Sequence, residues 1–75
     1  MIPSSIDGLA PYQQRVVQER TELDERRHLL SKFILSDTFI KLPDIQRALL
    51  IEQQAAMTMY STILSNRIQF FLGQT

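Results

Sequence analysis

The amino-acid sequence predicts an all-α protein: a helical hairpin of two long antiparallel helices, preceded by a short N-terminal arm or helix. Proline and glycine, which interrupt helices, are absent between Pro11 and Pro43 and again between Pro43 and Gly73. Within both uninterrupted segments the apolar residues recur at helical spacing. A chain of 75 residues is about half a typical domain, so residues 1–75 are expected to form one domain.

The first long helix is predicted over residues 11–35, after an arm over residues 1–10. Pro11 suits the first turn of a helix, where its missing N–H would be unpaired in any case. Val16, Leu23 and Leu30 recur every seven residues and form one apolar stripe, which Phe33 and Ile34 continue. Opposite charges four residues apart are expected to pair along its exposed side, at Arg15–Glu19, Arg20–Asp24 and Glu22–Arg26.

The connection between the helices is predicted over residues 36–42. Ser36 and Asp37 are turn formers, and the residue before Pro43 is biased away from the helical conformation. Three apolar residues make this segment too apolar for a free loop, so it is expected to pack down: Phe39, Ile40 and Leu42.

The second long helix is predicted over residues 43–72, with Asp44 complementing its dipole and Gly73 ending it. It is apolar on three sides, and the narrow stripe of the first helix can cover only one of them. The chain is therefore expected to form an obligate homo-oligomer. The three sides are Ile45, Leu49, Ala56, Tyr60, Ile63 and Phe70; Leu50, Met57, Leu64, Ile68 and Phe71; and Ile51, Ala55 and Met59.

Composition excludes several classes of function. The chain has no cysteine and one histidine, so neither a disulfide nor a metal site is expected, and no motif calls for a cofactor. A formal net charge of zero argues against binding long nucleic acid. No apolar run is long enough to span a membrane and no signal peptide is evident, so a soluble cytoplasmic protein is expected.

Five of the eight cationic residues lie between Pro11 and Phe33, beside a lone tyrosine. Tyr12 offers a flat face for a nucleobase, and Arg27 with its neighbour Arg26 offers guanidinium groups for phosphate. Fifteen helical residues separate Tyr12 from Arg27, a span of about 22 Å. One small ligand could touch both only at a junction between subunits. A charge run of this kind is more often simply a solvated face.

Catalytic signals are lacking in the sequence. His28 has no second metal ligand nearby, and no Ser-His-Asp set, glycine-rich loop or HExxH motif occurs. Arg67 lies one turn before two phenylalanines. The first interpretation is structural: its aliphatic part covers apolar surface while its guanidinium reaches water. No enzymatic activity is therefore expected.

Two segments resemble small tailed-phage proteins of the anti-CBASS cyclic-nucleotide sponge family. They are "YQQRVVQERTELDERRHLLSKFI" and "ALLIEQQAAMTMYSTILSNRIQFF", and the resemblance covers about residues 11–71. It implies a compact homohexamer of hairpins in the host bacterial cytoplasm. It also implies binding of cyclic dinucleotides such as 3′,3′-cGAMP, and in some members cyclic trinucleotides, without cleavage, so that CBASS effectors are not activated.

The resemblance also implies roles for particular residues. An aromatic residue that stacks on a base falls on Tyr12, and a cation that holds phosphate falls on Arg27, with Arg26 adjacent. The family cation is commonly lysine, so arginine keeps the charge and changes the contact geometry. A trinucleotide site would use Arg67, with Gln13 and Val17 as neighbours.

Two alternatives remain beside this reading. A helical oligomerisation or protein-interaction module without a nucleotide ligand fits the apolar second helix equally well. An enzyme that degrades the nucleotide would need metal ligands or a positioned base, and the sequence shows neither.

Overall fold

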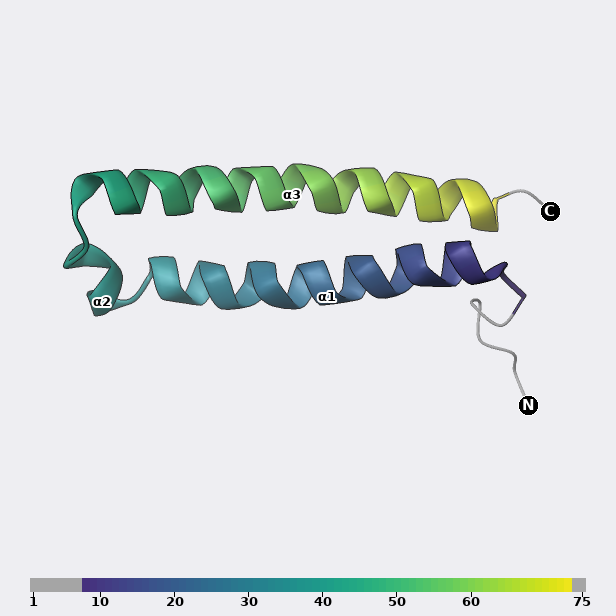
Figure 1. Cartoon of the computed structure of the whole chain (residues 1–75), viewed down its shortest axis with the longest axis horizontal. Helices are drawn as coiled ribbons and strands as arrows, with labels where there is room; N and C mark the ends of the chain where they lie inside the picture. Colours follow the sequence, from purple (N-terminus) through teal and green to yellow (C-terminus); the bar gives the residue numbers. More distant parts are fainter. Residues whose placement is uncertain (1–7, 74–75) are drawn as a thin grey trace.

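The computed structural model describes residues 8–73, and these form three helices: α1 (Pro11–Ile34), α2 (Asp37–Ile40) and α3 (Asp44–Leu72). The described part contains no strand, which confirms the all-α prediction. Figure 1 shows α1 and α3 side by side and antiparallel, with the short α2 at the closed end. The hairpin is elongated, with extents of 50 × 23 × 16 Å.

The helix ends lie close to their predicted positions. α1 begins at Pro11 as predicted and ends one residue early, while α3 begins one residue late and ends at the predicted Leu72. Gln13 caps α1, because its side-chain Oε1 accepts a hydrogen bond of 2.9 Å from the backbone N–H of Ala10. The predicted arm over residues 1–10 falls largely on residues 1–7, outside the described residues.

The connection holds a helical turn that the sequence did not predict. The Ser36 hydroxyl donates to the Phe33 carbonyl at 2.6 Å and accepts from the Phe39 backbone N–H at 3.3 Å, which caps α2. Phe39 is buried and meets the Phe33 ring edge-on at 6.3 Å. The expectation that this segment packs down is therefore confirmed for Phe39 and wrong for Ile40, which is 66% exposed.

The core lies along the single seam between α1 and α3. Val16 and Leu23 of the predicted first stripe face Leu64 and Ile68 of α3, and Leu64 is fully buried. Of the three apolar sides predicted for the second helix, α1 thus covers the one that contains Leu64.

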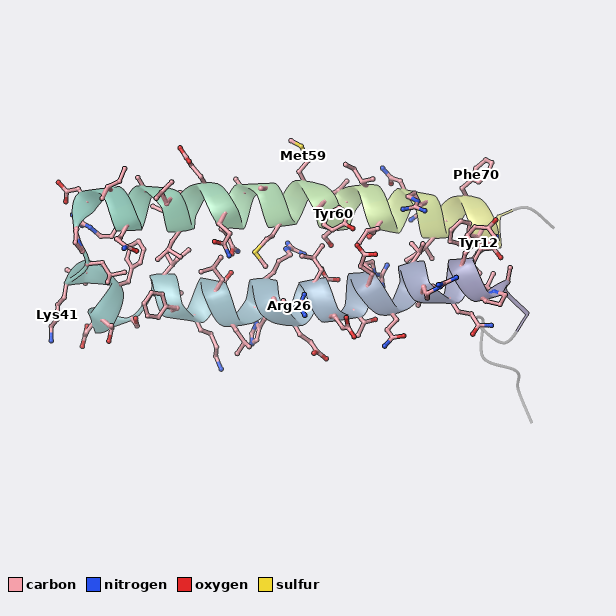
Figure 2. The ribbon with its side chains drawn as sticks, viewed as in Figure 1. Tyr12, Arg26, Lys41, Met59, Tyr60 and Phe70 are labelled. Carbon is pink, nitrogen blue, oxygen red and sulfur yellow. The ribbon has the colours of Figure 1, made fainter. Side chains whose placement is uncertain are left out.

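The other two apolar sides of α3 remain exposed in the single chain. Figure 2 shows Met59 and Phe70 pointing away from α1. An apolar surface of this extent is typical of interaction sites rather than of free solvent-facing helices. The exposed large apolar residues on α3 are Ile45, Leu49, Ile51, Met59, Tyr60, Ile63, Phe70 and Leu72.

One of the three predicted ion pairs forms. Arg20 Nε lies 3.8 Å from Asp24 Oδ2, whereas Arg15–Glu19 and Glu22–Arg26 are not ion pairs within the described residues. Those two predictions are wrong because exposed side chains gain little from pairing in water and keep their freedom. Among the described residues, no helix combines the length and the hydropathy that crossing a membrane requires.

Candidate functional site

A polar cluster crosses the seam between the helices halfway along the hairpin. Arg27 Nη1 donates to Asp24 Oδ1 at 2.8 Å and to Ser61 Oγ at 3.2 Å. The Ser61 hydroxyl in turn donates to Asp24 Oδ1 at 2.6 Å. The three groups close a triangle that joins α1 to α3, which fixes one end of the Arg27 guanidinium against the second helix.

Arg20 adds a second cation to this cluster. It lies 3.8 Å from Asp24 Oδ2, and its Nη1 reaches Ser65 Oγ on α3 at 3.5 Å. One carboxylate therefore lies between two guanidinium groups, and the cluster of Arg20, Asp24 and Arg27 carries a net charge of +1 from two cations and one anion. Half of the positive charge at this point of the hairpin is compensated within the chain.

A polar hollow of about 240 Å³ opens beside the cluster, lined by Asp24, Arg27, His28, Ser31 and Gln54. Gln54 Nε2 donates to Ser31 Oγ at 2.5 Å, which joins the helices a second time. Gln54 Oε1 and Arg27 Nε are buried there, and neither has a hydrogen-bond partner among the described residues. Polar atoms left without partners are suited to a polar ligand or water.

Arg26 differs from its neighbour. It is exposed, and no ion pair or hydrogen bond involving its side chain is found in the described part of the chain. Its guanidinium is therefore unconstrained, whereas that of Arg27 is held at one end.

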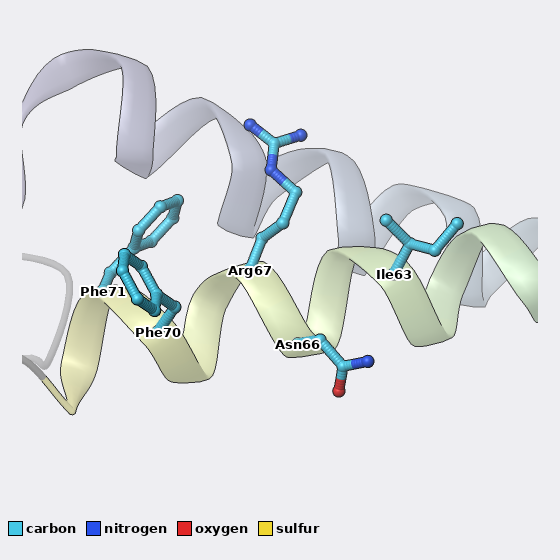
Figure 3. A pocket seen from close by; sticks show the side chains of 5 residues that line it. All are labelled: Ile63, Asn66, Arg67, Phe70 and Phe71. Carbon is cyan, nitrogen blue, oxygen red and sulfur yellow. The ribbon is translucent and has the colours of Figure 1, made fainter.

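The open end of the hairpin carries an aromatic group. Tyr12 is 57% exposed, and its ring meets Phe71 of α3 edge-on at 6.2 Å. Next to this pair, an open hollow of about 390 Å³ is lined by Arg67, Phe70, Phe71, Asn66 and Ile63. Figure 3 shows the two phenylalanines at one end of the hollow and Ile63 at the other, with Arg67 between them.

Gln13 and Val17 do not line this hollow in the single chain. The Gln13 amide caps α1, and Val17 packs against the core cluster. Tyr12 and Arg27 are likewise apart, since both lie on the unbroken α1 with fifteen residues between them, or about 22 Å. One chain thus supplies the two predicted halves of a nucleotide site at two separate places.

A protein-family model described as Sequestin matches residues 10–70, which is most of the chain. The chain belongs to the Sequestin family. No curated protein and no solved structure matches the chain. The Sequestin match confirms the family resemblance drawn from the sequence and includes every predicted site residue.

Ser61 is the site residue that sequence reasoning missed. It is the one polar side chain that is buried among the described residues, at 6% exposure. A sequence signal existed: Ser61 lies four residues after Met57 and three before Leu64, on the same side of α3 as that predicted apolar stripe. The described residues include no group of acidic and histidine side chains that could hold a metal ion.

Asp24→Asn is expected to reduce the dependence of stability on acidic pH. The Ser61 hydroxyl and the Arg27 guanidinium, both bonded to the carboxylate, lower the pKa of Asp24. A lowered folded-state pKa stabilises the chain above the unfolded-state value of about 3.9, and that contribution is lost as the pH falls through the folded-state pKa.

Thermal unfolding from pH 6 to pH 2.5 measures this effect. The melting temperature of the wild type should fall more than that of Asp24→Asn, and the two melting temperatures should converge at the lowest pH. Glu25→Gln is the matched control, because the neighbouring Glu25 is exposed and forms no ion pair within residues 8–73. Parallel curves for wild type and Asp24→Asn would contradict the assignment.

Proposed function

We propose that this protein is a phage anti-defence protein that binds cyclic oligonucleotide second messengers and holds them without cleavage. Cyclic dinucleotides such as 3′,3′-cGAMP are the proposed ligands, and their removal in the host bacterial cytoplasm prevents activation of CBASS effectors. Membership of the Sequestin family supports sequestration of a small ligand. The observation that carries the ligand class is Arg27, a guanidinium fixed at one end beside an open polar hollow.

The proposed dinucleotide site lies between subunits. Arg27 of one subunit holds phosphate, with the adjacent Arg26 as the alternative candidate for that role, and Tyr12 of another subunit stacks on a base. The 22 Å between Tyr12 and Arg27 in one chain supports a site shared by two chains, and the exposed apolar sides of α3 support association into a homo-oligomer. A hexamer is the proposed assembly, on the resemblance to the sponge family.

A second subsite is proposed for cyclic trinucleotides at the open end. Arg67 and the rings of Phe70 and Phe71 combine a phosphate-binding cation with flat surfaces for bases. Gln13 and Val17 would join this subsite only from a neighbouring subunit, because in their own chain they lie outside the hollow.

Titration calorimetry with 3′,3′-cGAMP tests the function. Tight binding is expected, and the ligand released by heating the complex should elute unchanged in chromatography. A shortened or linear product would contradict sequestration and indicate an enzyme. Tyr12→Ala should lose about 10-fold or more in affinity through lost stacking, whereas Tyr12→Phe, which keeps the ring, should bind nearly as the wild type.

The second candidate function is a helical oligomerisation or protein-interaction module. The observation that favours it is the uncovered apolar surface of α3. It predicts no thermal stabilisation by any member of a cyclic-nucleotide panel, because only a ligand that binds the native state raises the unfolding temperature.

A further inference from the structure

We propose that Asp24 is a specificity-determining residue, whose carboxylate between Arg20 and Arg27 makes the site favour cyclic phosphodiesters over linear nucleotides with terminal phosphates. This inference rests on the proposed function. It concerns a residue that makes no direct contact with ligand in the proposal and acts through the charge beside Arg27.

The geometry leaves part of Arg27 open. Its Nη1 is occupied by Asp24 and Ser61, at 2.8 and 3.2 Å. A guanidinium has five N–H donors, and within the described residues Nε and Nη2 of Arg27 have no hydrogen-bond partner. The occupied end faces α3 and Nε is buried, so the N–H groups of Nη2 are the donors that a phosphate would meet. A ligand held there is separated from the Asp24 carboxylate only by the Arg27 guanidinium.

The position of the carboxylate is fixed from both helices. Its Oδ1 accepts from Ser61 of α3 at 2.6 Å, and its Oδ2 lies 3.8 Å from Arg20 of α1. An ion pair within one exposed helix would swing freely and contribute little. The buried Ser61 hydroxyl removes that freedom, so the negative charge stays beside Arg27 when the ligand arrives.

The charge arithmetic gives the direction of selection. Two arginines and one carboxylate leave a net charge of +1, which matches a single phosphodiester. A terminal phosphate carries about −1.5 to −2 charges near pH 7, so its extra charge meets the fixed Asp24 carboxylate. His28, Ser31 and Gln54 are the other residues that line the hollow, and none of them is an anion. Built-in repulsion of this kind is how binding sites reject close analogues.

A protein that sequesters cyclic nucleotides needs to discriminate against linear ones. A cyclic signal must be captured in the presence of abundant linear nucleotides that offer the same bases and similar phosphates. Stacking on Tyr12 cannot tell them apart, since every base has a flat face. Charge can distinguish the two forms, because one phosphate carries a different charge in the cyclic and in the linear nucleotide.

The test compares 3′,3′-cGAMP with its linear counterpart, the same dinucleotide carrying a 5′-terminal phosphate. Titration calorimetry at pH 7.5 and fixed salt gives the ratio of the two affinities for the wild type and for Asp24→Asn. Asparagine keeps the shape of aspartate and its bonds to Ser61 and Arg27 while removing the charge. The preference for the cyclic ligand should fall by about 10-fold or more.

Glu25→Gln is the matched control, since it removes one negative charge from the adjacent exposed position without touching Arg27. Its ratio should equal that of the wild type. Both affinities come from one sample, so a partly unfolded variant does not change the ratio, and Asp24→Ser replaces Asp24→Asn if the latter does not fold. Equal ratios for all variants would overturn the inference while leaving sequestration intact, whereas a wild type that binds no cyclic dinucleotide would overturn the proposed function itself.

Discussion

Leu64→Ala is expected to lower the free energy of unfolding by about 2–5 kcal/mol. Leu64 is the one large side chain that is fully buried among the described residues, and it sits where α3 meets Val16 and Leu23 of α1. Truncation removes its buried methyl groups and leaves a cavity that two rigid helices fill poorly. A chain of 75 residues is worth about 4–11 kcal/mol in all, so much of its stability would be lost.

Urea unfolding followed by circular dichroism measures this loss, at one fixed protein concentration because association adds to apparent stability. Leu35→Ala is the control. Leu35 is 86% exposed and directly follows α1, so the same truncation there should cost less than about 0.5 kcal/mol. Comparable losses at both positions would mean that the core does not lie along the seam.

The helical architecture could be predicted because the sequence carries two signals of it, the positions of helix-breaking residues and the spacing of apolar residues. From Pro11 onward, proline and glycine occur only at the ends of the long helices, at Pro11, Pro43 and Gly73. The seven-residue stripe of Val16 and Leu23 indicates the covered side. These are local signals with strong backbone consequences. The turn of α2 was missed because it depends on one capping contact, that of Ser36 with Phe39.

The candidate site was predictable only in part, because its geometry is made by contacts between helices. Tyr12 and Arg27 stand out by residue type, and their separation follows from helical rise alone. Spacing places Ser61 on the covered side of α3, but its bonds to Arg27 and Asp24 depend on how far α3 is shifted along α1, which spacing within one helix does not give. The predicted ion pairs of Arg15 and Arg26 do not form, because spacing permits the contact but exposed charges gain little free energy from pairing in water.

Arg27→Ala is expected to weaken binding of 3′,3′-cGAMP by about 10- to 100-fold. The variant removes the proposed phosphate contact and also leaves the Asp24 carboxylate with only Arg20 and Ser61 as partners. That carboxylate then repels the ligand instead of orienting a cation. The core cluster is untouched, so the oligomer should persist in light scattering.

Arg26→Ala is the neighbouring control, with the same chemical change at an exposed side chain that has no partner within the described residues. It should cost less than about threefold, because an unconstrained surface charge contributes little. Adding Asp24→Asn to Arg27→Ala should recover part of the affinity, since the residual repulsion goes with the charge. If Arg26→Ala instead loses more than Arg27→Ala, the phosphate is held by Arg26, and the triangle of Asp24, Arg27 and Ser61 serves only to join the two helices.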